Sequence, residues 1–236
     1  MRFQRFGGPT VSFTYGGLRF VTDPTFDEPG EYPIGDRTLV KTAPPLAPAP
    51  DAADVVLLSH DQHPDNLDRS GRDFLSSVPL VLSTPTAAGR LGGGVRGLEP
   101  WASAHQGGVT VTAVPAQHGP DGTEHLTGPV TGFVLAASGA PTVYVSGDNA
   151  SLPVVRQVAD RFPDIEVAVL FGGAARTALL GAANLTLDAA GLVEAARILG
   201  AREVAVVHVD SWAHFTEGHD DVRVAFDEAG LGSVLV

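Results

Sequence analysis

The sequence predicts an α/β (α+β) protein in which two mixed β-sheets stack face to face with helices outside, as a single domain over residues 1–236. Two observations predict it. Strand and helix patterns follow in the order β-rich, strand–helix, β-rich, and then alternating helix and strand, which is typical of layered architectures. No linker composition divides the chain, and 44% hydrophobic residues are enough for one sizeable core.

The N-terminal part is expected to form a hairpin followed by a long irregular segment. Thr10–Tyr15 and Leu18–Thr22 have strand patterns and flank Gly16-Gly17, which is a hairpin signal. Regular periodicity then stops from Asp23 to Asp51, where prolines are frequent. Loops of this length are uncommon in compact domains and are usually functional or disordered. We therefore favour a wall over a site, with an extended surface segment as the alternative.

The rest of the chain alternates strands and helices. A buried strand over 55–58 precedes a helix from Leu67 to Ser76, for which Asn66 is the expected N-cap. Thr186 is expected to cap a helix that stops at Gly200, and Ser233–Val236 to form a last edge strand. The other expected strands are 79–83, 109–114, 131–136, 141–146, 165–171 and 203–209. The helix capped by Thr186 spans 187–199, and the other expected helices are 84–91, 151–162 and 220–229.

Composition excludes several classes of function. The formal net charge of −12 disfavours nucleic acid as the main partner, because phosphate binding needs a basic face. The absence of cysteine excludes disulfides, thiolate metal sites and cysteine nucleophiles, so a metal must use nitrogen and oxygen ligands. No stretch has the length of a signal peptide or a membrane span, and a soluble cytoplasmic protein without membrane partners is expected.

Four short segments share one property: each follows a predicted strand and ends in residues that can bind a metal. They contain His60, His63 and Asp65 in the first segment, His118 in the second, Asp148 in the third and His208 in the fourth. Strand ends at one edge of a sheet converge in space, so these residues can share an ion. Imidazole and carboxylate are ligands that suit a borderline divalent metal such as zinc.

These segments resemble the metallo-β-lactamase superfamily, and more narrowly its ascorbate-6-phosphate lactonase-like branch of predicted metal-dependent hydrolases. The resemblance spans nearly the whole chain. It is carried by Thr22-Asp23-Pro24, Leu58 to Asn66, Pro115 to His118, Ser146-Gly147-Asp148 and the terminal His208. It implies a four-layer αββα sandwich with a metal site at one edge.

The sequence departs from the usual family pattern, His-x-His-x-Asp-His, at two positions. Counting back from Asp65, His63 matches the second histidine and Asn66 stands in place of the third. His60 lies one residue too early, and Asp61 takes the in-register position. Either a one-residue insertion keeps His60 as a ligand or Asp61 replaces it. We favour His60, because it follows the strand as the family histidine does.

The resemblance implies one well-held ion at His60, His63 and His118, with Asp148 nearby. A second ion at Asp65, Asp148 and His208 is less strongly predicted, because asparagine is a weak neutral ligand. Zinc is the expected metal, with manganese and iron as alternatives.

The function expected from these residues is hydrolysis of a small-molecule ester, lactone or phosphoester by a metal-activated water. Asp65 is suited to orient that water or accept its proton, and His214 to protonate a leaving group or stabilise an oxyanion. Packing between Trp212 and Phe215 is an equal alternative for His214. A second hypothesis is a degenerate site on a ligand-binding protein with weak or no catalysis. Nuclease activity is a third, but the chain has no basic insertion for it.

Overall fold

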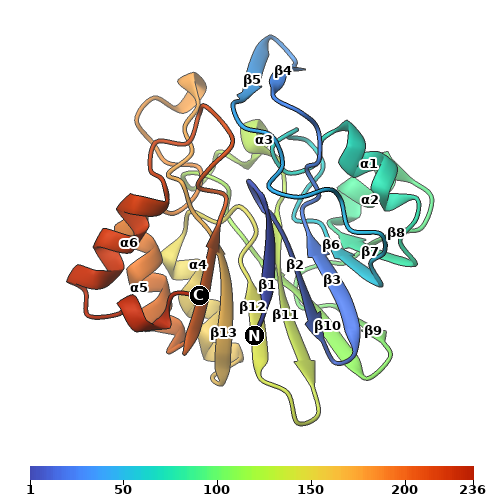
Figure 1. Ribbon diagram of the computed structural model, residues 1–236, viewed down its shortest axis with the longest axis vertical. Helices are drawn as coiled ribbons and strands as arrows, with labels where there is room; N and C mark the ends of the chain where they lie inside the picture. Colours follow the sequence, from blue (N-terminus) through green and yellow to red (C-terminus); the bar gives the residue numbers. More distant parts are fainter.

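The computed structural model describes residues 1–236 and contains two six-stranded β-sheets stacked face to face, with helices on both outer sides (Figure 1). This arrangement confirms the predicted αββα sandwich. The loops that connect the strands gather at the upper end of the sandwich, where a separate two-stranded hairpin also stands (Figure 1).

The first sheet is mixed. Its strands are β1 (Phe3–Gly7), β2 (Thr10–Tyr15), β3 (Leu18–Thr22), β6 (Val55–Leu57), β7 (Leu80–Ser83) and β8 (Val95–Gly97), and they pair in the order β1-β2-β3-β6-β7-β8. The first three are antiparallel, and the pairs from β3 to β8 are parallel. Helices α1 (Arg69–Leu75) and α2 (Pro85–Leu91) cover its outer side (Figure 1).

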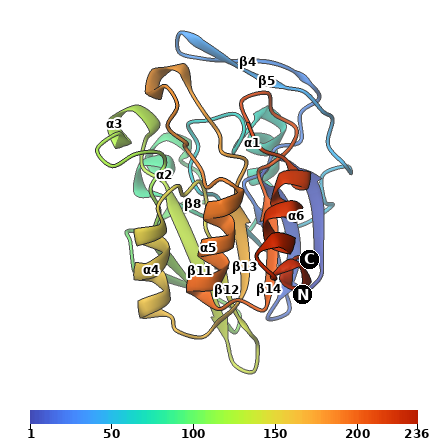
Figure 2. The same cartoon turned by 90° about the vertical axis from the view of Figure 1, so that its left-hand side faces the viewer.

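The second sheet is also mixed. Its strands are β9 (Ser103–Gln106), β10 (Val109–Pro115), β11 (Thr131–Ala137), β12 (Thr142–Val145), β13 (Ile165–Phe171) and β14 (Glu203–Val207), paired in the order β14-β13-β12-β11-β10-β9. Helices α4 (Leu152–Arg161), α5 (Ala189–Leu199) and α6 (His219–Glu228) lie over its outer face (Figure 2). None of the helices is long and apolar enough to cross a membrane.

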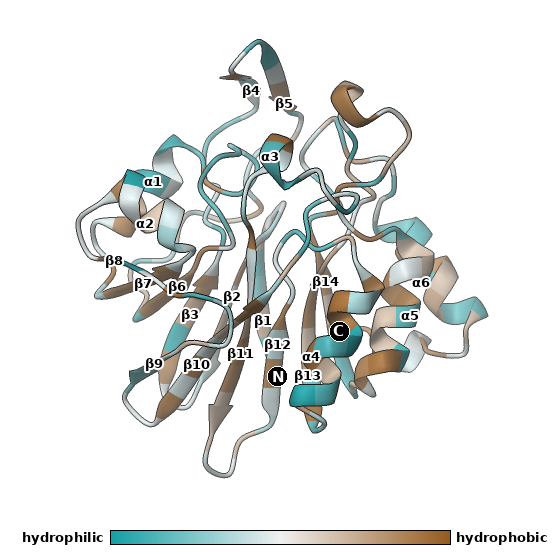
Figure 3. Ribbon diagram, turned by 180° about the vertical axis from the view of Figure 1, so that it is seen from behind, coloured by the Kyte–Doolittle hydropathy of each residue, from teal (hydrophilic) through white to brown (hydrophobic).

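Side-chain alternation along the strands buries both faces of each sheet, one in the core between the sheets and the other against the outer helices. In β13, Val167, Val169 and Phe171 pack between the sheets, whereas Ala168 and Leu170 pack against the outer helices. Strand β6 alternates in the same way. Figure 3 shows apolar residues along the strands and a mixture of hydrophilic and apolar residues on the helices. Successive side chains of a strand point to opposite faces, so a continuous apolar run contributes side chains to the cores on both faces of the sheet.

The segment from 23 to 51 is less irregular than predicted. It contains a hairpin of β4 (Gly30–Ile34) and β5 (Arg37–Lys41), which form a sheet of their own. Proline argues against a strand in a sequence because it cannot donate a backbone hydrogen bond. Pro33 is tolerated here because both strands of a two-stranded sheet are edge strands. The hairpin packs back on the sandwich through a bridge between Lys41 and Trp212. Three short edge strands, β1, β8 and β9, were also not predicted.

Three local predictions were wrong. The N-cap of α1 is Asp68, which accepts a hydrogen bond from Gly71 N at 2.8 Å, and not Asn66, which is turned into the interior. The N-cap of α5 is Asp188 and not Thr186, whose hydroxyl instead donates to Gly172 O. The C-terminal edge strand is reduced to one residue: Gly232–Val234 form a 3-10 turn, and only Leu235 pairs with Val204 of β14, through an isolated parallel bridge. The predicted stop at Gly200 is confirmed by its left-handed conformation.

The core between the sheets should dominate stability. Phe133 on β11 is only 1% exposed and packs between the sheets, so Phe133→Ala should lower the free energy of unfolding by about 3–5 kcal/mol. Urea unfolding followed by circular dichroism measures the change. Val224 on α6 is 46% exposed, and Val224→Ala should change the same quantity by less than about 0.5 kcal/mol. Similar losses for both variants would contradict this assignment of the core.

Candidate metal centre

The four segments singled out in the sequence meet at one edge of the sandwich. His60 and His63 follow β6 of the first sheet, whereas His118, Asp148 and His208 follow β10, β12 and β14 of the second. Their ligand atoms form two groups, His60 with His63 and His118, and Asp65 with Asp148 and His208, each with all atoms within 4.8 Å of one another. The site therefore lies on the seam between the two sheets.

The first group is a triangle of imidazole nitrogens. His60 Nε2 lies 2.9 Å from His63 Nδ1, and His118 Nε2 lies 3.3 Å from the same atom. Tetrahedral zinc with Zn–N bonds of about 2.0–2.1 Å places its nitrogen ligands roughly 3.3–3.4 Å apart. The spacing of the three nitrogens is thus close to that of a zinc ligand set.

The opposite ring nitrogens set the orientation of two of these histidines. His60 Nδ1 donates to Ser59 Oγ at 2.9 Å, and that hydroxyl donates to Asp23 Oδ2 at 2.5 Å. His118 Nδ1 donates to the carbonyl of Leu185 at 2.9 Å. Because these nitrogens carry the proton, the Nε2 lone pairs of both rings point toward the centre of the triangle. Such outer partners are typical of metal-bound histidines.

The second group contains two buried carboxylates and a buried histidine. His208 Nε2 lies 3.4 Å from Asp65 Oδ2 and 3.5 Å from Asp148 Oδ1, while its Nδ1 donates to Gly172 O at 3.2 Å. Asp148 Oδ2 lies 3.8 Å from His118 Nε2, which joins the two groups.

Three buried polar atoms of the second group have no hydrogen-bond partner: Asp65 Oδ1, Asp148 Oδ2 and His208 Nε2. A buried polar atom without a partner is costly. A cation would satisfy the two carboxylate oxygens directly, and His208 Nε2 once its proton is displaced. The residues of both groups therefore fit divalent metal ions.

Backbone geometry at the site is unusual in ways that aim these side chains. His208 has φ +62° and Asp23 has φ +27°, conformations that residues other than glycine adopt rarely. Gly147, before Asp148, has φ +58°, and a Cβ there would lie 2.5 Å from Thr131 O and 2.9 Å from Ser59 Cβ. Only glycine fits the turn that brings Asp148 beside the end of β6.

The structure places His60, and not Asp61, in the triangle. Asp61 turns away and accepts hydrogen bonds from Arg90 Nε at 3.1 and 3.0 Å. Asn66 is fully buried, and its amide donates to Asp23 Oδ2 at 3.0 Å and to Asp148 Oδ1 at 2.9 Å. The asparagine thus holds two carboxylates together at the position where the family pattern has a histidine.

Burial and neighbouring charges shift the histidine pKa values of the two groups in opposite directions. Burial and the adjacent His118 lower the pKa of His63 to about 4, and burial with His63 lowers that of His60 well below its ordinary value. Burial alone would lower the pKa of His208, but Asp148 and Asp65 outweigh it and raise that pKa to about 9. His60 and His63 are therefore neutral at pH 7, while His208 carries a proton between two carboxylates.

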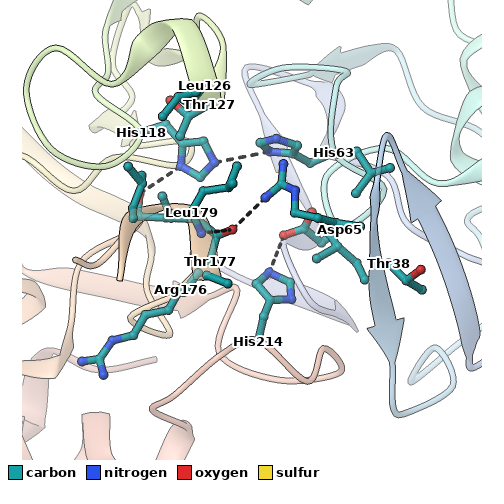
Figure 4. Close-up of a pocket in the computed structure, with 17 residues that line it drawn as sticks. Thr38, His63, Asp65, His118, Leu126, Thr127, Arg176, Thr177, Leu179 and His214 are labelled. Atoms are coloured by element: carbon teal, nitrogen blue, oxygen red, sulfur yellow. Dashed lines mark hydrogen bonds and ion pairs between the residues drawn. The ribbon is translucent and has the colours of Figure 1, made fainter. Parts of the chain in front are cut away.

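His63 and His118 of the first group and Asp65 of the second form the floor of a pocket of about 370 Å³ (Figure 4), whereas His60, Asp148 and His208 are not part of its lining. His214 also lines the pocket, and its Nε2 lies 3.0 Å from Asp65 Oδ2. His214 therefore contacts a site carboxylate, although it also packs against Phe215 with ring centroids 4.6 Å apart. The predicted wall exists as well, because β4 and β5 line the pocket through Ile34, Arg37, Thr38 and Leu39.

Comparison with known proteins identifies the family. Residues 18–209 match the family described as beta-lactamase superfamily domain. The chain belongs to the beta-lactamase superfamily. The UPF0173 metal-dependent hydrolase of Methanosphaerula palustris is 27% identical to this superfamily member over 195 residues, covering 79% of this chain and 82% of that protein.

Solved structures of the beta-lactamase superfamily fold agree with this one. An isothiocyanate hydrolase from Delia radicum gut bacteria is 21% identical, with a TM-score of 0.84 over 100% of this chain and 95% of its own. A possible metal-dependent hydrolase from Veillonella parvula is 19% identical, with a TM-score of 0.81 over 99% and 95%. At these identities the likeness establishes the fold.

Some contacts of this superfamily site could not be predicted from the sequence. The contact of Ser59 and Asp23 with His60 depends on pairing between β3 and β6, and Arg37 reaches the pocket only because 30–41 forms a hairpin. The Thr22-Asp23-Pro24 segment was part of the family resemblance, but its position behind His60 became visible only in the structure.

A pair of adjacent substitutions tests which residue belongs to the superfamily metal site. His60→Ala should weaken metal binding by more than about 100-fold, because it removes a nitrogen of the triangle. Asp61→Asn should leave the metal content unchanged, because Asp61 pairs with Arg90 outside the site. Elemental analysis of both purified variants, with circular dichroism as a folding control, measures the difference. Metal loss in Asp61→Asn alone would reverse the assignment.

Proton release should distinguish the two groups. An ion at Asp65, Asp148 and His208 must displace the proton of His208, so its affinity should rise roughly tenfold per pH unit from pH 6 to 9. An ion at the triangle displaces no proton from His60 or His63 in this range. Calorimetric zinc titrations in buffers of different ionisation enthalpy count the protons. Equal release of about one proton at both sites would contradict this difference.

Proposed function

We propose that this protein is a metal-dependent hydrolase that acts on a small-molecule ester, lactone or phosphoester. One observation carries the proposal: two joined groups of imidazole and carboxylate ligands lie at a single pocket of about 370 Å³, whose lining includes His63, His118 and Asp65. A pocket of this volume suits a compact substrate and not a polymer. The name of the Methanosphaerula relative, a metal-dependent hydrolase, supports the same reaction class.

The histidine triangle is the proposed site of the better-held ion, and Asp65, Asp148 and His208 are the proposed ligands of a second. Three nitrogens without thiolates favour zinc, while the two carboxylates also suit manganese or iron. When bound, such an ion supplies Lewis acidity and a water of lowered pKa. Asp148, 3.8 Å from His118, is placed between the two groups and can serve both.

Asp65 and His214 are the proposed proton carriers. Burial raises the pKa of Asp65, but the adjacent His214 and His208 outweigh it and hold that pKa well below its ordinary value. An ionised Asp65 can orient a water and accept its proton. His214 Nε2, 3.0 Å from Asp65 Oδ2 and facing the pocket, can pass a proton on to a leaving group.

The narrower proposal, a lactonase of the ascorbate-6-phosphate lactonase-like type, rests on the sequence resemblance and guides the choice of first substrates. A degenerate site with weak or no catalysis is the second candidate, and the observation behind it is Asn66, which links Asp148 to Asp23 where the family has a histidine. Metal content separates the two candidates. No bound ion after reconstitution with zinc, manganese or iron would support the degenerate site.

His214 supplies the sharpest catalytic test. His214→Gln should lower kcat about 10²–10⁴-fold on γ-butyrolactone, 4-nitrophenyl acetate or bis(4-nitrophenyl) phosphate, whichever the wild-type protein hydrolyses. Metal content should not change, because His214 belongs to neither ligand group.

The matched control is His105→Gln. His105 lies on β9 and is exposed, with Nδ1 3.1 Å from Thr110 Oγ1. Its substitution should leave kcat unchanged. An unaltered kcat in His214→Gln would show that this histidine serves packing against Phe215.

A further inference from the structure

Three segments from different parts of the chain wall the pocket above the candidate metal centre. They are the β4–β5 hairpin, helix α3 (Glu124–Thr127) and the loop around the 3-10 turn Ala178–Leu180. Each contributes large apolar side chains. Leu126 and Leu179 are 42% and 55% exposed, unusual values for leucine, and both line the pocket (Figure 4). The walls therefore offer an apolar surface to a ligand.

The charge of the pocket lining is opposite to that of the chain. The lining contains two arginines, Arg37 and Arg176, and one carboxylate, Asp65, which gives 2 − 1 = +1 with neutral histidines. The whole chain has a formal net charge of −12. A cationic pocket in an acidic protein concentrates and selects anions.

The two arginines are not equivalent. Arg37 Nη1 donates to Thr177 Oγ1 at 2.7 Å, across the pocket from the hairpin to the opposite wall. This is the single hydrogen bond of its side chain, and no carboxylate lies within 4.0 Å of it, so most of its N–H donors have no protein partner. Arg176 instead donates to Asn184 Oδ1 at 2.9 Å, and its guanidinium lies apart from His63 and Asp65 (Figure 4).

A guanidinium without an acidic partner, beside an apolar wall, is suited to bind an anion through two parallel hydrogen bonds. Thr177 keeps the side chain extended across the pocket. The unpaired donors are therefore held in position before a ligand arrives.

We propose that Arg37 is a specificity-determining residue that binds an anionic oxygen group of the substrate, a carboxylate or a phosphate. The substrate then has an apolar body against Leu126 and Leu179 and its reacting bond at the pocket floor. This assignment rests on the proposed hydrolase function for the identity of the ligand as a substrate. The anion site itself depends only on Arg37 and the pocket.

The competing role for Arg37 is structural: its bond to Thr177 would only tie the hairpin to the opposite wall. Thr177→Val separates these roles, because it removes the acceptor and keeps the guanidinium. If Arg37 binds the anion, Thr177→Val should weaken binding much less than Arg37→Gln. If the tie alone matters, both variants should show the same loss.

The experiment is calorimetric titration of the metal-loaded protein with benzoate, phenyl phosphate and neutral benzyl alcohol. In Arg37→Gln, the Kd of at least one anion should rise about 10–100-fold, and that of benzyl alcohol should stay within about threefold. The anion with the larger loss identifies carboxylate or phosphate as the group bound. The matched control, Arg176→Gln, removes one charge from the same pocket and should change each Kd by less than about threefold.

The outcomes separate the two proposals. Equal losses in Arg37→Gln and Arg176→Gln, unchanged anion binding in Arg37→Gln, or no anion binding by the wild-type protein would each overturn the assignment of Arg37. Binding that depends on Arg37 in a metal-loaded protein that hydrolyses none of the esters, lactones or phosphoesters would retain the anion site and remove the hydrolase function.

Discussion

The contact between the two sheets at the end of β6 is the constraint on which the site depends. Ser59 accepts a hydrogen bond from Thr131 N of the second sheet at 3.1 Å, and Gly147 allows the close approach of Asp148 to the same place. The first sheet contributes His60, and the second contributes His118. A shift of either sheet would separate the ligands, so the geometry of the centre depends on the packing between the sheets.

Burial of the centre has an energetic cost that the fold partly offsets. His60 and His63 are neutral imidazoles, and the second group places a protonated His208 between Asp65 and Asp148. Even so, buried oxygens of both carboxylates remain without partners. Positive φ values at His208 and Asp23 add local strain. Such departures from good packing concentrate where a protein binds a ligand, and here they all lie in or beside the two ligand groups.

The floor and the walls of the pocket have different origins. Strand ends hold the floor rigidly, whereas a hairpin, a four-residue helix and a 3-10 turn supply the walls. This division separates chemistry from selectivity, because loops vary more easily than the elements that support them. The cationic Arg37 and the exposed leucines belong to the walls. They are the features of this protein that its strand-end motifs do not determine.

By itself, the sequence determined the layered fold and the strand-end residues of the candidate centre, because alternation and apolar runs are local signals and the ligand motifs follow the strands directly. Only the tertiary structure decided three features of the site. These are the choice of His60 over Asp61 in the triangle, the position of Asn66, and the hydrogen bonds behind His60. Each depends on contacts between distant segments: Asp61 with Arg90, Asn66 with Asp148, and Ser59 with Asp23. Arg37 belongs with them, since its place over the pocket comes from a hairpin that local pattern did not reveal.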